Sequence, residues 1–308
     1  MTEPLRPLSI GELLDRTFSL YRQNFKLFVG VSILGPAAML CFQTALSAIG
    51  VGGSNGSGVI RNSPSVIAAI IVGVVVYLIG HSISAAATVR AVAAVYLGRV
   101  ISIGEAFSSV KGRVMRVVGV VISAMLLVML VGALLIGVGA AIFSLGITLP
   151  TGTAARIVGG LLGGAVLVAL ILVVIGFAVR YALAVQACVV ESLGVGASLT
   201  RSRVLAKGDR KRIVTTYVVC MVVIYVVSLL FTGLSMLVPT GHSLLARQAA
   251  TQVANLLAGA LAAPLMTIAM SLVYYDERVR KEAFDLQFLM ESLDGVSPME
   301  APVADLGQ

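Results

Sequence analysis

Residues 210–238 read RKRIVTTYVVCMVVIYVVSLLFTGLSMLV, and their pattern indicates the fold class. Three basic residues stand directly before an uncharged run over residues 213–238. The run is longer than the about 20 residues that a helix needs to cross a bilayer. Basic flanks stay in the cytoplasm while a membrane protein inserts. The stretch therefore predicts a membrane-spanning helix that begins on the cytoplasmic side.

Five more apolar stretches of spanning length occur along the chain. They cover residues 27–49, 66–90, 117–143, 157–180 and 252–275. The chain holds 22 Lys and Arg residues, and if it crosses six times only Arg61, Arg156 and Arg247 lie on the far side. This placement predicts a polytopic protein with six transmembrane helices and both termini in the cytoplasm.

The composition agrees and limits the partners. Hydrophobic residues make up 58% of the chain and charged residues 12%, whereas soluble domains average about 25% charged residues. The net charge of +8 favours membrane lipids with anionic headgroups over nucleic acid, because no aromatic side chains alternate with the basic ones to stack on bases. The expected cytoplasmic basic interface consists of Arg16, Arg22, Lys26, Lys111, Arg113, Arg116, Arg201, Lys207, Arg210, Lys211 and Arg212.

The chain also carries an internal repeat. Gly11, Gly104 and Gly196 follow one another at intervals of 93 and 92 residues. The first two lie within the segments Ser9–Glu12 and Ser102–Glu105. Both segments are capping boxes, in which the Ser caps a helix start and the Glu reaches back to it. Each repeat therefore predicts a short cytoplasmic amphipathic helix that leads into a hairpin of two spanning helices.

Three such units fill one predicted all-α membrane domain over residues 1–293. The units cover about residues 9–100, 101–192 and 193–290. Residues 52–65 are rich in Gly, Ser and Asn and predict a flexible loop, and residues 294–308 predict a disordered tail.

The first short helix, expected near residues 10–26, has an apolar face and a charged face. Such a helix can lie in the membrane interface. It can also pack beneath the helix bundle without a separate role. The sequence leaves both interpretations open.

Polar side chains within the apolar stretches are few. His81 lies roughly 13 Å along a helix from Arg90, near the middle of the membrane, where it is expected to face the bundle. It is either a hydrogen-bonded structural residue or a ligand or proton site. Gln252 and Asn255 lie near the start of the last stretch and can bond to neighbouring helices. Since no catalytic or metal-ligating group of side chains is evident, we expect a non-enzymatic protein without cofactor or metal.

Small residues predict close packing of helices. Two overlapping Gly-xxx-Gly pairs are formed by Gly159, Gly160, Gly163 and Gly164. Such a face serves the bundle itself, a homo-oligomer or contact with another membrane protein, and the bundle is the commoner use. Pro36 and Pro264 lie within the first and last stretches and are expected to kink those helices.

The two ends of the chain resemble a known family. Residues 6–18 read RPLSIGELLDRTF and residues 274–286 read YYDERVRKEAFDL. Together with Thr200–Ser202 and Lys207–Gly208, they resemble bacterial proteins named for the membrane domain of glycerophosphoryl diester phosphodiesterases. The family takes its name from proteins in which such a membrane region is joined to a catalytic barrel, and nothing in this chain resembles the barrel. The resemblance implies a relative of the membrane part in the bacterial cytoplasmic membrane, without phosphodiesterase activity.

Two functions fit these observations. The first is an accessory or scaffold role in the inner membrane, connected to lipids or envelope assembly. The second is a transporter or lipid-handling permease, because internal repeats recur in transporters. A polar cavity lined by His81, Gln252 or Asn255 would favour the second function, whereas a solid apolar bundle would favour the first.

Overall fold

The computed structural model describes residues 8–48, 64–148, 153–239 and 243–283, and the regular elements in these ranges are all helices. Within them, six segments are long and apolar enough to cross a membrane. The chain is therefore an all-helical, multi-pass membrane protein, as the sequence predicts. The predicted tail at 294–308 lies outside the described residues, and so does the predicted loop at 52–65 except for its last two positions.

The spanning helices follow the predicted stretches within a few residues. They are α2 (Phe25–Ser32) with α3 (Leu34–Ala48), α4 (Pro64–Tyr96), α6 (Val114–Thr148), α7 (Thr153–Val179), α10 (Arg210–Met236) and α11 (Leu244–Glu282). The fourth spanning segment continues past α7 into the short helix α8 (Ala184–Val190). Helices suit these apolar runs because each backbone group finds its hydrogen-bond partner within the same segment.

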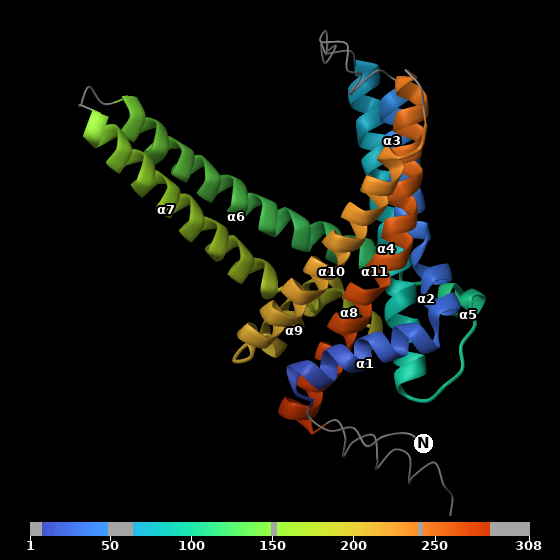
Figure 1. The fold of residues 1–308 in the computed structure, drawn as a ribbon. Coiled ribbons are helices and arrows are strands. Elements are labelled where there is room, and N and C mark those ends of the chain that lie inside the picture. The colour runs from blue at the N-terminus through green and yellow to red at the C-terminus, as the bar shows by residue number, and fades with distance from the viewer. Residues whose placement is uncertain (1–7, 49–63, 149–152, 240–242, 284–308) are drawn as a thin grey trace, which may run out of the picture.

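Three more short helices lie with α8 at one end of the molecule (Figure 1). They are α1 (Ile10–Gln23), α5 (Ile103–Ser108) and α9 (Val195–Leu205). Both predicted capping boxes are formed. The Glu12 carboxylate accepts from the Ser9 N–H at 2.7 Å, and the Glu12 N–H donates to the Ser9 hydroxyl at 3.3 Å. In α5 the same two bonds join Ser102 and Glu105 at 2.7 and 3.2 Å.

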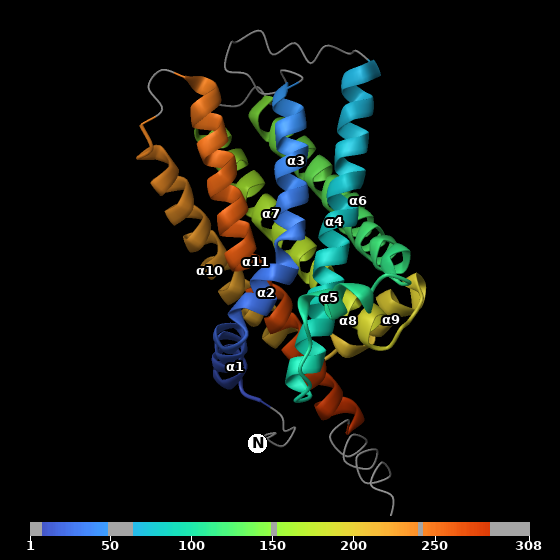
Figure 2. The ribbon, with the colours of Figure 1, turned by 90° about the vertical axis from the view of Figure 1, so that its right-hand side faces the viewer.

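The spanning helices form two groups that diverge from this end (Figure 1). α3, α4 and α11 pack on one another, and α10 packs along α11. α6 and α7 pack on each other and lean away from the first group. Figure 2, turned by a right angle, shows α3 between α4 and α11. Close helix packing is therefore concentrated in the first group and at the end where the two groups join.

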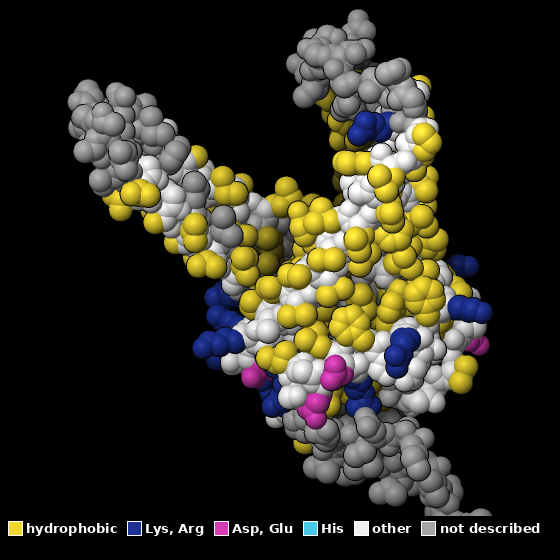
Figure 3. All heavy atoms as spheres, viewed as in Figure 1, with side chains coloured by type: hydrophobic (Ala, Val, Ile, Leu, Met, Phe, Trp, Pro, Cys, Tyr) yellow, Lys and Arg dark blue, Asp and Glu magenta, His cyan; other side chains and the backbone are white. Residues whose placement is uncertain are grey.

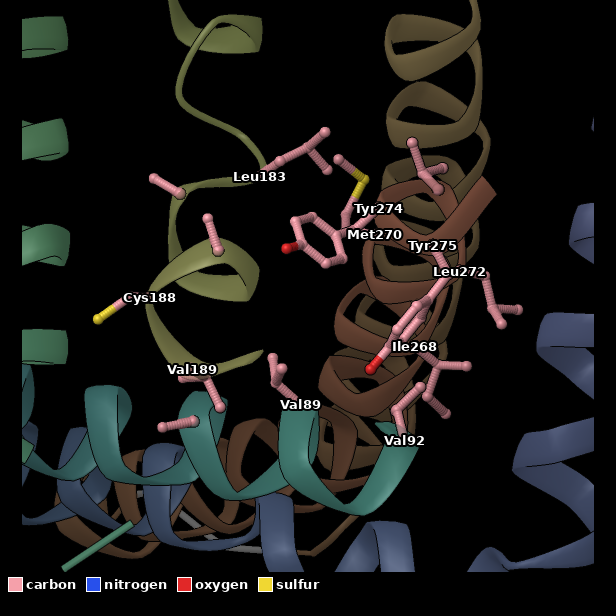
Figure 4. Packing of buried hydrophobic residues seen from close by; sticks show 14 of the residues in the cluster. Val89, Val92, Leu183, Cys188, Val189, Ile268, Met270, Leu272, Tyr274 and Tyr275 are labelled. Atoms are coloured by element: carbon pink, nitrogen blue, oxygen red, sulfur yellow. The ribbon is translucent and has the colours of Figure 1, made fainter. Parts of the chain in front are cut away.

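The buried core lies at that junction (Figure 4). Val189 of α8 lies beside Val89 of α4, and Leu183, just before α8, points toward Tyr274 of α11. These four side chains are at most 1% exposed. The break between α7 and α8 is closed by Ser202 of α9, whose hydroxyl accepts from the Leu183 N–H at 3.2 Å. The core therefore fixes the short helices to the ends of α4 and α11.

Pro36 accounts for the break between α2 and α3. A proline has no N–H, so the carbonyl four residues earlier loses its helical partner. That carbonyl belongs to Ser32, the last residue of α2. The Ser84 hydroxyl of α4 donates to it at 3.0 Å. At the predicted kink Ile33 keeps helical φ and ψ, and the carbonyl that loses its partner is capped by a neighbouring helix.

Glycines outside the predicted set let helices approach closely. A Cβ added to Gly80 of α4 would lie 2.6 Å from the Cβ of Ala38, and a Cβ on Gly259 of α11 would lie 2.9 Å from Pro36. A Cβ on Gly160 or Gly164 would meet no described atom within 4 Å. Among the described residues these two glycines bring no helices together, and their use in a homo-oligomer stays a prediction. The other predicted packing glycines, Gly159 and Gly163, lie on the same helix, α7.

Candidate ligand cavity and charged layer

A cavity of ≈260 Å³ lies between α3, α4 and α11. All three predicted intramembrane polar residues, His81, Gln252 and Asn255, line it. The rest of the lining consists of Gly35, Pro36, Met39, Leu40, Gln43, Tyr77, Leu256, Gly259 and Ala263. The fold therefore brings polar side chains from three helices together on an otherwise apolar wall.

His81 lies on the α4 side of this cavity. Its ring stacks on Tyr77, one turn earlier, with the ring centroids 5.6 Å apart and the planes 28° apart. Gly35 of α3 lies against the ring, because a Cβ there would be 3.6 Å from the His81 Nδ1. A Cβ at this distance would make an ordinary van der Waals contact, so α3 packs directly against the His81 ring.

Near the end of α3, the Ser47 hydroxyl forms hydrogen bonds that connect α3 with α11. This hydroxyl donates to the Gln43 carbonyl oxygen at 2.7 Å. It accepts from the Gln252 amide at 3.3 Å and from the Gln248 amide. These bonds join the first turns of α11 to α3 and position the side chain of Gln252.

The lining contains no Asp, Glu, Lys or Arg. Amide groups and a neutral imidazole each both donate and accept hydrogen bonds. The cavity can therefore bind a molecule through hydrogen bonds and apolar contact, but none of the residues lining it is a permanently charged counterpart for an ionic ligand.

At the end of the molecule that holds the short helices, charged side chains form a layer. Asp276 of α11 is at its centre, with a side chain that is only 1% exposed. Its carboxylate accepts from the Leu8 N–H at 2.6 Å and from the Arg280 Nε at 2.7 Å. It also lies 2.8 Å from the Arg212 guanidinium. Asp276 thus holds the segment before α1 and the start of α10 against α11.

Arg201 of α9 makes a second junction in the charged layer. Its Nε donates to both oxygens of Glu191 at 2.9 Å, and its guanidinium donates to Glu282 at 2.7 Å. Hydrogen bonding to Glu282, and then to Glu191, raises the pKa of Arg201. The Tyr274 hydroxyl also donates to Glu191. Arg201 is therefore a fixed internal cation that links α9 to the end of α11.

A third junction is built around Glu277, whose side chain is fully buried. The Lys281 ammonium lies 2.7 Å from this carboxylate and 3.4 Å from Asp209. The same ammonium donates to the Lys207 carbonyl oxygen at 3.0 Å. These contacts hold the turn before α10 against α11.

The predicted basic interface therefore divides into two sets. Arg201 and Arg212 are neutralised inside the charged layer, Arg16 lies over the Tyr96 ring at 5.0 Å, and Arg113 is half-buried. The exposed members are Arg22, Lys26, Lys111, Arg116, Lys207, Arg210 and Lys211. In Figure 3 most of the visible Lys and Arg side chains gather below the apolar surface of the spanning helices. This band is where phosphate headgroups would contact a protein whose apolar surface lies in the bilayer.

Arg210 and Lys211 line a surface groove of ≈630 Å³ at the start of α10. The chain enters α10 through Gly208, whose φ of +102° is a conformation that favours glycine. In the part of the chain that the structure describes, no carboxylate pairs with Arg210 or Lys211. Since Asp209 is engaged by Lys281, the groove keeps two positive charges that no described carboxylate neutralises.

Sequence reasoning missed two groups of residues. Gln43 and Tyr77 complete the cavity, and Gln43 is a polar residue within an apolar stretch, so the signal that identified Gln252 could have identified it. The pairing of Asp276 and Glu282 with particular basic side chains was also missed, because these partners come from distant parts of the chain.

Comparison with known proteins assigns no family. No protein-family model matches this chain, and no curated protein or solved structure matches it either.

Proposed function

We propose that this chain is a non-enzymatic protein of the bacterial cytoplasmic membrane, with both termini in the cytoplasm and an accessory or scaffold role linked to lipids or envelope assembly. In this proposal the exposed basic residues of the charged layer bind anionic headgroups of the inner leaflet. The observation that supports this proposal is that the carboxylates of the charged layer form ion pairs with Arg201, Arg212, Arg280 and Lys281. No described carboxylate pairs with the exposed Arg210 and Lys211, which leaves their charge for an external anion.

The experiment replaces the two exposed residues together, Arg210→Gln and Lys211→Gln, and leaves Arg212 in its ion pair. Each basic residue near an anionic surface contributes about 1 kcal/mol, so each loss should weaken binding of an anionic lipid about fivefold. The readout is the amount of phosphatidylglycerol that stays with the full chain in mixed nanodiscs, measured by mass spectrometry. Raised salt should have the same effect on the unaltered protein, because screening acts on the same attraction.

The matched control is the charge-preserving pair Arg210→Lys and Lys211→Arg, which should retain phosphatidylglycerol. The orientation of each variant is checked in parallel, because basic residues also direct insertion. If the glutamine pair is correctly inserted and keeps its phosphatidylglycerol, the residues serve insertion alone and the lipid-binding proposal fails.

We further propose that the chain consists of three repeats and is related to the membrane domain of glycerophosphoryl diester phosphodiesterases. The starts of α1 at Ile10, α5 at Ile103 and α9 at Val195 support the repeat, since each short helix begins at the expected position. In an experimental structure in lipid, superposition of the three units should align Gly11, Gly104 and Gly196. A unit that cannot be superposed would contradict the repeat.

The second candidate function is a transporter or lipid-handling permease. The cavity lined by His81, Gln252 and Asn255 favours it, because ligand sites within helical membrane proteins are formed by polar groups on facing helices. Movement of a fluorescent lipid between leaflets of liposomes that contain the protein would support this candidate. Movement at the rate of protein-free liposomes would count against it.

A further inference from the structure

We infer that the cavity between α3, α4 and α11 binds the uncharged head group of a membrane amphiphile, whose apolar chain lies outside on the helix surface. The inference concerns residues other than the exposed basic set. It gives the second candidate function a ligand class, and it stands or falls separately from anionic-lipid binding at Arg210 and Lys211.

The cavity is accessible from the bilayer. Two of the polar lining residues, His81 and Asn255, are exposed at the molecular surface, so the cavity opens outward. The same three helices expose Leu34, Val76 and Leu257. Since these are spanning helices, their exposed apolar side chains face lipid tails. A molecule can therefore enter the cavity sideways from the bilayer.

Two polar groups that line the cavity have unused hydrogen-bonding capacity. Gln252 donates to Ser47, whereas in the described ranges no protein hydrogen bond engages the His81 ring or the Asn255 amide. An amide without a hydrogen-bond partner in hydrocarbon costs several kcal/mol, and a bound molecule that supplies a partner removes that cost. Both groups therefore favour a bound molecule that offers hydroxyl or carbonyl oxygens.

The lining of the cavity also determines which charge a ligand can carry. None of the residues that line the cavity is Asp, Glu, Lys or Arg. A phosphate or ammonium group moved from water into such a site would lose its hydration without gaining a fixed counter-charge, which is strongly unfavourable. The cavity therefore selects an uncharged head group over an ionic one.

The size of the cavity limits which part of a ligand can enter it. The cavity measures ≈260 Å³, and one water occupies about 30 Å³ in the liquid, so there is room for roughly nine water-sized groups. A glycerol or a quinone ring fits this space, whereas a complete lipid does not. The head group enters and the acyl or isoprenoid chain remains in the bilayer.

The test offers the detergent-purified full chain two lipids with the same acyl chains, dioleoylglycerol and dioleoyl phosphatidylglycerol. Native mass spectrometry counts the bound molecules. We expect dioleoylglycerol to bind at one saturable site whose affinity does not change with salt. Equal or tighter binding of phosphatidylglycerol at that site would overturn the inference.

The variants Asn255→Leu and Gln252→Leu remove the hydrogen-bonding groups and nearly conserve volume. Each should weaken dioleoylglycerol binding about fivefold, the usual effect of one lost hydrogen bond. The matched control is Gln248→Leu on the same helix. Gln248 does not line the cavity, so this variant should bind dioleoylglycerol as the unaltered protein does. Unchanged binding in both cavity variants would overturn the inference.

A photolabelling experiment needs no variant and therefore covers the case in which the substitutions impair folding. Dioleoylglycerol with a diazirine near the glycerol should label residues 35–43, 77–81 or 252–263. Label spread evenly over the six spanning segments would overturn the inference. The glutamine pair at Arg210 and Lys211 should keep this labelling even if it loses phosphatidylglycerol, which separates the failure of one proposal from that of the other.

Discussion

The Ser32 hydroxyl of α2 donates a hydrogen bond to the Ala260 carbonyl oxygen of α11 at 3.1 Å. Ala260 lies four residues before Pro264, which has no N–H to offer to that carbonyl. Close by, the Tyr21 hydroxyl donates to the Leu261 carbonyl oxygen at 2.7 Å. Side chains of α1 and α2 therefore satisfy the turn of α11 that the proline weakens, and this allows α11 to continue as one helix.

A double-mutant cycle tests this relationship. Ser32→Ala should lower the free energy of unfolding by about 1 kcal/mol, because it leaves the Ala260 carbonyl without a partner. In a Pro264→Ala background, residue 264 supplies the missing N–H, so the same substitution should cost much less. Thermal unfolding in detergent measures both effects. Two costs that simply add would mean that Ser32 does not compensate for the proline.

The ion pair around Asp276 makes a second prediction. Asp276→Asn should destabilise the protein by about 3–5 kcal/mol, because it leaves the 11%-exposed Arg212 guanidinium without its counter-charge. Adding Arg212→Met should recover part of the loss. The control is Asp15→Asn on the exposed side of α1, which should change unfolding little. An Asp276→Asn protein that unfolds like the unaltered chain would show the pair to be dispensable.

The packing glycines make a third prediction. Gly80→Ala places a Cβ 2.6 Å from that of Ala38 and should cost about 1–3 kcal/mol through overpacking. Gly164→Ala meets open space within 4 Å and should be neutral or slightly stabilising, since Ala favours a helix over Gly. Unfolding of the monomer in detergent compares the two. The reverse order of stability would mean that α3 and α4 pack differently.

A fourth prediction concerns the capping box of α5. The Ser102 backbone N–H donates to the Glu105 carboxylate, and this bond, with a contribution from the Ser102 side chain, lowers the pKa of Glu105. The cap therefore contributes above the ordinary pKa of a glutamate and is lost as the pH falls through the lowered value. Carbon NMR of labelled Glu105 should show the low pKa, and Ser102→Ala should raise it. An unshifted Glu105 in the unaltered protein would mean that the box is open.

The sequence was sufficient for the spanning helices and the two capping boxes because these depend on local pattern. A long apolar run and a Ser-x-x-Glu segment act over neighbouring residues, so α6, α10 and the starts of α1 and α5 lie where expected. A kink at Pro36 was expected, but the hydrogen bond that caps the Ser32 carbonyl was not, because its donor, Ser84, lies on another helix.

The candidate sites depend on tertiary structure and were predicted only as separate residues. His81 and Asn255 were each recognised as polar side chains in apolar stretches, but nothing local shows that they line one cavity. Arg212 and Lys211 look alike in the sequence, although one is neutralised by Asp276 and the other is exposed. The glycines at 160 and 164 have a favourable spacing, yet the helices approach at Gly80 and Gly259 because Ala38 and Pro36 face those positions.

We propose that the charged layer faces the cytoplasm, and cysteine labelling measures this orientation. Single cysteines are placed at the exposed positions Lys111, Lys207 and Leu245, in a chain whose three native cysteines are replaced by serine. A membrane-impermeant maleimide should label the cysteine at 245 in intact cells and those at 111 and 207 only after the membrane is permeabilised. Labelling of position 111 or 207 in intact cells would contradict the topology and the lipid-binding proposal that rests on it.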